Sequence, residues 1–248
     1  MKNALLLLLI NFSICKFALA GEDTLHLYFN KNWEDCTKDT ATYYTIAYKT
    51  GKLWDRKDYW ASTNKIQMQG FFKKKDFKTK VGAFVYYYES GSKKSESNYN
   101  NDGEIETEIH YYENGKKKAE VKVEEGETIA KGWDEDGKLI PHYIYEREAK
   151  YPGGRMGWSS FLENNLNADV ASNSGAAVGQ YKVVLQFIVN KEGFVENIEA
   201  VERPSNCIPC VIEALRVMSY SPRWIPAIQF NKPVLYRAKQ PIIFQVVK

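Results

Sequence analysis

The sequence predicts an α+β protein, with an N-terminal antiparallel β-meander of hairpin repeats followed by a small domain of order αββαβ. Three observations predict it. Glycines recur every eleven or twelve residues from Gly91 to Gly137, and the segments between them alternate apolar and polar side chains. Beyond the Pro-Gly-Gly sequence at residues 152–154, apolar residues appear at helical spacing. Glycine-containing turns, a period of two and a later period of 3.6 are typical of hairpins, half-buried strands and helices, respectively.

The composition is that of a globular, β-rich chain. Of the 248 residues, 44% are hydrophobic and 26% are charged, which excludes a disordered chain. Aromatic residues make up 14%, as strands favour. The net charge is +3, and it falls to +1 if a leader containing Lys2 and Lys16 is removed. A nearly neutral chain offers no electrostatic footprint for nucleic acid, so we expect no nucleic-acid partner.

Residues 1–20 are predicted to be a cleaved signal peptide. Lys2 precedes an apolar run, and the small residues Ala18 to Ala20 end it, which is the pattern of a secretory leader. Lys16 interrupts the run and leaves it short for a membrane span. We therefore expect an exported, periplasmic protein, with an uncleaved membrane-anchored form as the alternative.

The repeats occupy the predicted domain of residues 21–146. "YYESGSKK" at residue 87 recurs as "YYENGKKK" at residue 111 and more weakly as "WDEDGKLI" at residue 133. Residues 66–140 resemble MORN-type repeats, and a divergent repeat is expected around Gly51. The resemblance implies a solenoid of β-hairpins that binds partners or surfaces. The same rows of Tyr, Lys and Glu also suit a plain scaffold, because cross-strand aromatic and charged pairs stabilise any sheet.

The predicted C-terminal domain covers residues 147–248. A helix is expected over residues 156–166, a strand over Tyr181–Asn190, a second strand over Phe194–Val201, a helix over Cys210–Met218 and a last strand from Val234 to Val246. Together these segments give the order αββαβ.

Two prolines frame a tryptophan between the last helix and the last strand. Pro222 is expected to end the helix, because proline disfavours helix in the residue before it. Pro226 keeps the connection extended. Trp224 is then expected to fold back as an apolar plug between helix and sheet.

Residues 151–248 resemble the C-terminal domain of TonB proteins, through "YPGG", "LQFIVNKEGFVENIEAV", "EALRVM", "SPRWIPA" and "KPV" in that order. The structural motif of the resemblance comprises Pro152, Gly153, Gly154, Pro222, Trp224 and Pro226. It implies binding of an extended TonB-box-like peptide from an outer-membrane receptor by strand addition. The residues that would carry this binding on the last strand are Val234, Tyr236, Arg237, Lys239, Ile242 and Phe244. Pro241 within this strand suits an edge position.

The chain departs from an energy transducer in two features. It holds only 8 Pro, and repeats stand where a transducer has a long proline-rich linker. The expected function is therefore that of a periplasmic protein-binding module that is not an enzyme, linked to outer-membrane receptor transport or to other envelope proteins. We expect no cofactor, and no metal, because His26, His110 and His142 show no ligand spacing. A structural envelope protein is one alternative.

The cysteines offer another alternative. Cys207 and Cys210 form a Cys-x-x-Cys sequence before a helix, which is the spacing of thiol-disulfide oxidoreductases. A disulfide that staples the loop before the helix explains the same pair in an oxidising compartment. We expect the disulfide, because the flanking sequence lacks the strand that leads into a thioredoxin-type motif.

Overall fold

The computed structural model describes residues 24–247 and divides the chain into two compact units, Met1–Glu108 and Ile109–Lys248. The predicted signal peptide lies outside the described residues. The division falls inside a strand of the repeats, because the second unit also includes the last hairpins of the meander. The boundary expected between residues 146 and 147 stays a prediction.

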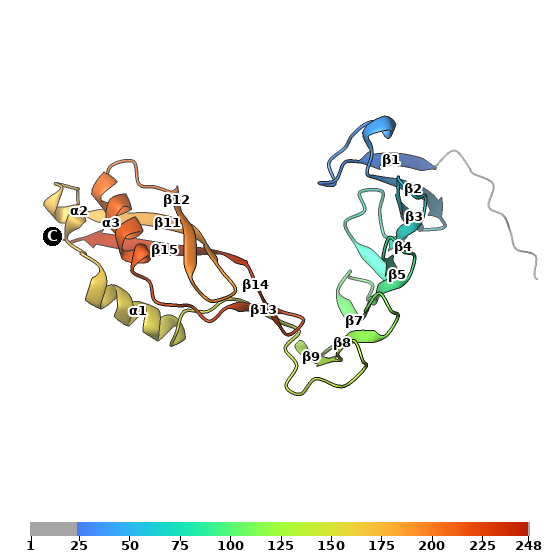
Figure 1. Cartoon of the computed structure of the whole chain (residues 1–248). Coiled ribbons are helices and arrows are strands. Elements are labelled where there is room, and N and C mark those ends of the chain that lie inside the picture. Colours follow the sequence, from blue (N-terminus) through green and yellow to red (C-terminus); the bar gives the residue numbers. More distant parts are fainter. Residues whose placement is uncertain (1–23, 248) are drawn as a thin grey trace, which may run out of the picture. The chain divides into compact units, whose positions relative to one another are not determined.

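The repeats form one antiparallel meander in which every strand pairs with its neighbours in the sequence, in the order β1 to β9 (Figure 1). The strands are β1 Leu25–Phe29, β2 Tyr43–Thr50, β3 Leu53–Trp60, β4 Ile66–Phe72, β5 Lys80–Tyr87, β6 Lys93–Tyr99, β7 Ile105–Tyr111, β8 Lys117–Glu124 and β9 Glu127–Gly132. A short 3-10 helix, Lys38–Thr40, lies between β1 and β2. The hairpin β2–β3 turns at Gly51, where a divergent repeat was expected.

The predicted glycines make the turns between strands. Gly91, Gly103, Gly115, Gly126 and Gly137 all have φ between 82° and 97°. Only glycine adopts this left-handed region without a steric cost, because other residues bring Cβ against a carbonyl oxygen. The spacing between the glycines therefore sets the length of the strands, and each repeat is eleven or twelve residues long.

Aromatic packing fills the core of the first unit. Trp54, Met68, Phe72 and Phe84 are buried there beside Ala47. Phe72 and Phe84 meet edge to face, with ring centroids 5.1 Å apart. At Gly70, a Cβ would lie 2.5 Å from the ring of Phe84, so glycine is needed for this ring to lie against β4.

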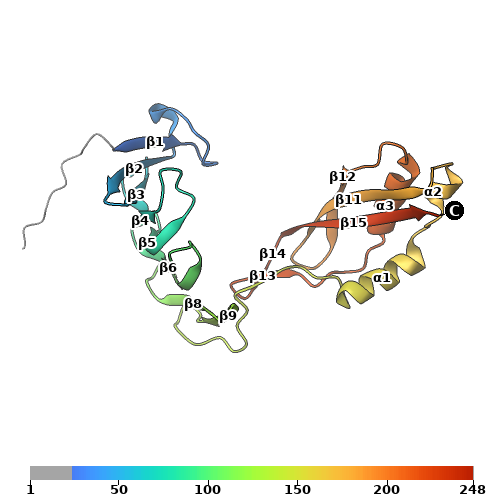
Figure 2. The same ribbon diagram turned by 180° about the vertical axis from the view of Figure 1, so that it is seen from behind.

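The C-terminal part combines helices with two small sheets. Its elements are β10 Glu146–Arg147, α1 Gly154–Asn165, α2 Val170–Asn173, β11 Gly179–Val189, β12 Val195–Glu202, α3 Ile208–Ser219, β13 Ala227–Gln229, β14 Lys232–Val234 and β15 Tyr236–Val246. One sheet has the order β12-β11-β15 and the other the order β10-β13-β14. Figure 1 shows α3 in front of the first sheet, and Figure 2 shows the same sheet from behind. The α+β class is thus confirmed at this coarse level.

The structure corrects one predicted element in this region. The last strand was expected to run unbroken from Val234 to Val246, but Leu235 interrupts it. Val234 ends β14, where it pairs with Ala227, and the long strand begins at Tyr236. The apolar run that suggested one strand therefore serves two strands of different sheets.

Trp224 lies in the core between the helices and the sheet β12-β11-β15. Its side chain is 8% exposed. Its ring lies 5.2 Å from that of Phe187 on β11 and 5.5 Å from that of Tyr151, measured between centroids. Its indole N–H donates to the hydroxyl of Ser221 at 3.0 Å, so the polar edge is satisfied. A large apolar group is thereby placed where three segments of the chain meet.

The hairpin β13–β14 forms an arm whose tip binds the segment before β10. At the tip, the amides of Phe230 and Asn231 donate to the carbonyls of Tyr145 and Ile144, at 2.7 and 2.8 Å. The Phe230 ring meets His110 edge to face, with centroids 4.7 Å apart, and the ammonium of Lys118 lies 3.9 Å from its centroid. The arm is therefore anchored to the end of the meander that belongs to the same compact unit.

We predict that Trp224→Ala destabilises the protein by about 3–5 kcal/mol, because a buried aromatic ring and its contacts are lost from a closely packed site. Urea unfolding followed by circular dichroism measures the change. Ile225→Ala is the matched control, since the side chain of Ile225 is 43% exposed. A loss below about 1 kcal/mol for Trp224→Ala would contradict its role in the core.

Candidate functional site

The strand β15 forms an edge of the sheet β12-β11-β15 and is the candidate binding site. It is 11 residues long and pairs over its whole length with β11 alone, from Tyr236 opposite Val189 to Val246 opposite Gly179. A long edge strand presents a row of unpaired amide and carbonyl groups, onto which another extended chain can add.

Pro241 indicates which residues of β15 turn their backbone to the open edge. Pro241 lies opposite Val184, and it has no amide hydrogen to donate to β11. Antiparallel pairs alternate between hydrogen-bonded and non-hydrogen-bonded. The pair Val184–Pro241 is therefore expected to be non-hydrogen-bonded. The residues two and four positions away then also turn their backbone N–H and C=O groups to the open edge. They are Arg237, Lys239, Ile243 and Gln245, and their side chains are exposed on one face of the sheet.

The six residues predicted for partner binding separate into three groups. Arg237 and Lys239 are exposed on β15, and Tyr236 is partly exposed at its start. Ile242 and Phe244 are each 1% exposed and belong to the core, and in this register their backbone groups face β11, so neither residue is offered to a partner. Val234 lies on β14 and is not part of the edge strand. Ile243, which was not among the predicted residues, is 53% exposed and lies two positions from Pro241 on the outward row.

The opposite edge of the same sheet, β12, is less suited to adding a strand. It carries exposed carboxylates on Glu196, Glu199 and Glu202. Its pairing with β11 shifts register twice, and Asn197 has a positive φ of 53°. Charged side chains and bulges are the features by which edge strands avoid further pairing. The two edges therefore differ, and β15 is the open one.

Two glycine contacts position the elements behind this edge. At Gly193, in the turn between β11 and β12, a Cβ would lie 2.2 Å from the carbonyl oxygen of Trp224. The same turn accepts a hydrogen bond from the Trp224 amide at 2.8 Å. Gly153 and Gly154 have φ of 74° and 61° and lead from Pro152 into α1. The motif residues of "YPGG" thus make a left-handed turn that starts a helix.

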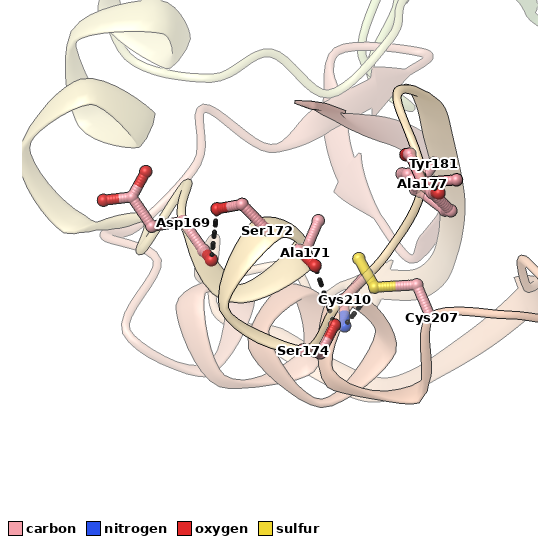
Figure 3. Close-up of a disulfide and its surroundings, with 8 residues drawn as sticks. All are labelled: Asp169, Ala171, Ser172, Ser174, Ala177, Tyr181, Cys207 and Cys210. Atoms are coloured by element: carbon pink, nitrogen blue, oxygen red, sulfur yellow. Dashed lines mark hydrogen bonds between the residues drawn. A yellow bond between two sulfur atoms is a disulfide. The ribbon is translucent and has the colours of Figure 1, made fainter. Parts of the chain in front are cut away.

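Cys207 and Cys210 form a disulfide at the start of α3. Figure 3 shows it beside α2 and the beginning of β11. The two residues are 1% and 0% exposed, and the sulfur of Cys207 accepts a hydrogen bond from the amide of Cys210 at 3.3 Å. A redox enzyme needs an accessible sulfur. The buried bond suits a staple of the helix start and does not offer that access.

Glu213, which was not predicted, is the buried carboxylate of this region. Glu213 is 5% exposed, and its carboxylate accepts hydrogen bonds from Arg216 at 2.6 and 2.7 Å and from the amide of Asn167 at 2.7 Å. The hydrogen bonds from Arg216 lower the pKa of Glu213, against the opposing effect of burial. The carboxylate therefore joins α3 to the segment between α1 and α2.

A cavity of about 220 Å³ lies where the arm meets the last repeat. Its walls include Tyr143, Lys118 and Phe230. Burial raises the pKa of Tyr143 to about 12, so this phenol stays protonated at neutral pH. The cavity is smaller than the roughly 300–1,000 Å³ of drug-sized ligand sites.

Among residues 24–247, no three His, Cys, Asp or Glu side chains are grouped so that they could hold a metal ion. No helix in this described part of the chain has the length and apolar character needed to cross a bilayer.

The chain was compared with protein-family models, curated proteins and solved structures. No protein-family model matches the chain, and no curated protein does. Among solved structures, a variant of S. aureus TarM in complex with fondaparinux, alpha-GlcNAc-glycerol and UDP matches with 12% sequence identity and a TM-score of 0.27. The match covers 44% of this chain and 21% of the TarM chain.

This match corrects the prediction that the protein is not an enzyme, because TarM is a glycosyltransferase. At a TM-score of 0.27, the match does not show that the present chain transfers sugars.

We predict that Glu213→Gln lowers the stability at pH 7 by about 1.5–3 kcal/mol, because hydrogen bonds to a charged group are lost. The folded pKa of Glu213 lies below its unfolded value, so its stabilisation is complete above the unfolded value of about 4.3 and is lost as the pH falls through the folded pKa. Urea unfolding between pH 7 and pH 2 should show a smaller acid-induced loss in the variant.

Glu202→Gln is the control for this prediction. Its carboxylate pairs with Lys182 at 3.1 Å, and both side chains are more than half exposed. We expect it to change stability by less than about 0.5 kcal/mol. An equal effect of the two substitutions would contradict the role of Glu213.

We predict that replacing both Cys207 and Cys210 by Ala lowers stability by about 2 kcal/mol, since the loop that they close is short and little chain entropy is removed by the bond. The urea midpoint of the variant measures this. If the native protein instead turned over a dithiol substrate, and Cys207→Ser abolished the turnover, the staple interpretation would be wrong.

Proposed function

We propose that the protein binds an extended peptide segment of an envelope protein by adding it as a strand to the open edge of β15. The observation that carries the proposal is the contrast between the two edges of one sheet. The edge β15 is long and pairs on one side only, while β12 is charged and bulged. Main-chain hydrogen bonds supply the affinity in this mode, and the exposed side chains of the outward row supply specificity.

The core supports the proposal by holding β15 rigidly. Ile242 and Phe244 anchor the strand from the helix side, and β11 pairs with every one of its residues. A strand that is already ordered loses little conformational entropy when a peptide pairs with it, so more of the interaction energy appears as affinity. An edge without such anchoring would have to be ordered by the peptide itself.

The resemblance of residues 151–248 to TonB C-terminal domains identifies the class of partner that we propose. In that family, the partner is a short extended segment of an outer-membrane receptor. The leader-like residues 1–20 support export to the periplasm, where such a segment is found. Because the chain has few prolines, we propose capture of the segment and not transmission of force over a long linker.

We predict that Ile243→Pro weakens peptide binding about tenfold or more. Proline removes an amide donor that points to the open edge, while the side chain that it replaces is 53% exposed. The measurement uses 12-residue peptides selected by phage display on residues 21–248, with affinities determined by calorimetry.

The control is Ile243→Thr, which keeps the amide hydrogen and a β-branched side chain. We expect it to bind within about twofold of the native protein. Undiminished binding to Ile243→Pro would overturn the proposed site. Pull-down of solubilised outer-membrane proteins with the native chain, and loss of the same partners with Ile243→Pro, would identify the receptor class.

A further inference from the structure

Trp33 occupies a turn position that the other turns of the same geometry give to glycine. In its turn, the amide of Asn30 donates to the carbonyl of Glu34, and the amide of Trp33 donates to the carbonyl of Asn30, both at 3.0 Å. The same pair of bonds closes the turns that contain Gly91, Gly103, Gly115, Gly137 and Gly193. These glycines have φ between 82° and 97°, and Trp33 has a φ of 62°.

A bulky residue in this conformation lowers stability, because its Cβ approaches a carbonyl oxygen. Asn30 holds the turn in place, since its side-chain oxygen accepts hydrogen bonds from the amides of Asn32 and Glu34 at 2.8 and 3.2 Å. Strain that a structure maintains in this way is typical of functional positions. The fold therefore places an indole at a position where glycine would have less steric strain.

The indole of Trp33 extends a row of aromatic rings at one end of the sheet. Phe29, Tyr43 and Trp60 lie opposite one another on β1, β2 and β3. Trp33 stacks on Tyr43 with ring centroids 4.4 Å apart and an angle of 6°, and Tyr43 lies 5.1 Å from Trp60. Phe29 lies 5.6 Å from Trp33. We call these four residues the aromatic row.

The outer end of the aromatic row is open to solvent. Trp33 is 40% exposed, although Tyr43 covers one face of its indole. Its neighbours in the turn, Lys31, Asn32 and Glu34, also have exposed side chains. Among residues 30–35, the exposed charged side chains are those of Lys31, Glu34 and Asp35, which give no positive field, so neither nucleic acid nor an anionic membrane is favoured.

From this geometry we propose that the aromatic row binds a neutral oligosaccharide, with one sugar ring on the indole of Trp33. The carbon–hydrogen face of a pyranose is flat and apolar and matches a flat indole, while the hydroxyl groups at its rim can bond to Asn32, Lys31 and Glu34. A proline-rich peptide would need a groove between aromatic rings. Trp33 and Tyr43 instead stack face to face and leave no groove between them.

The test is Trp33→Gly in the chain of residues 21–248, titrated with chitotetraose, cellotetraose and a proline-rich decapeptide by calorimetry. We expect binding of at least one tetrasaccharide to fall tenfold or more, while the melting temperature is unchanged or rises because glycine relieves the turn. Trp33→Phe should retain part of the affinity. Phe71→Ala, which removes a 38% exposed ring outside the aromatic row, should change nothing.

Three outcomes would overturn the proposal. The first is that neither tetrasaccharide binds the native chain, and the second is that Trp33→Gly binds them as the native chain does. The third is that only the decapeptide binds. A large fall in melting temperature of Trp33→Gly, with sugar affinity retained, would show that Trp33 only caps the sheet. Loss of sugar binding without a change in melting temperature is the result that the strained turn predicts.

Discussion

The contact between Trp224 and the turn at Gly193 fixes the arrangement of the C-terminal part of the chain. The amide of Trp224 donates to the carbonyl of Gly193, and the approach is so close that no side chain fits at that glycine. Trp224 follows α3, and Gly193 joins β11 to β12. The contact therefore ties the end of the helix to the end of the strand pair. From there, the chain can build its arm and return as β15 along the free side of β11.

The proposed function depends on that arrangement. Because β15 is placed beside β11 with Ile242 and Phe244 in the core, its other side is left as a rigid open edge. The glutamates and shifted register of β12 discourage the same use of the opposite edge. The buried disulfide and the Glu213 carboxylate act on the elements behind the sheet. They stabilise the helix that supports the edge without facing a partner themselves.

The repeats show how one turn geometry can serve two purposes. Glycine at the left-handed position lets strands reverse with little strain, and a constant step between glycines gives the meander its regular strands. At Trp33 the same turn accepts a strained aromatic residue, and the ring extends a row across three strands. A scaffold of equal hairpins can thus carry a binding surface where one turn departs from the rule.

Local chemistry in the sequence determined much of the protein. Glycine spacing fixed the hairpins, alternation fixed the strands β7 and β8, and helical spacing around Trp158 and Leu215 fixed α1 and α3. These features depend on neighbours within one turn or one strand. The burial of Trp224 could be expected for the same reason, since two prolines limit where its ring can go.

Only the tertiary structure decided which residues are available to a partner. Val234 and Tyr236 are two residues apart, yet they belong to different sheets, because the arm must turn at Phe230 and reach Tyr145. Ile243 and Ile242 are adjacent and equally apolar, but one is exposed and the other is in the core. The position of Trp33 in a glycine-type turn is visible only in its backbone angle and hydrogen bonds, because "NKNWE" contains no glycine. Pairing across long sequence distances settles the first two points, and the sequence carries no local signal for it. The turn at Trp33 is closed by bonds within residues 30–34, and there the missing glycine concealed it.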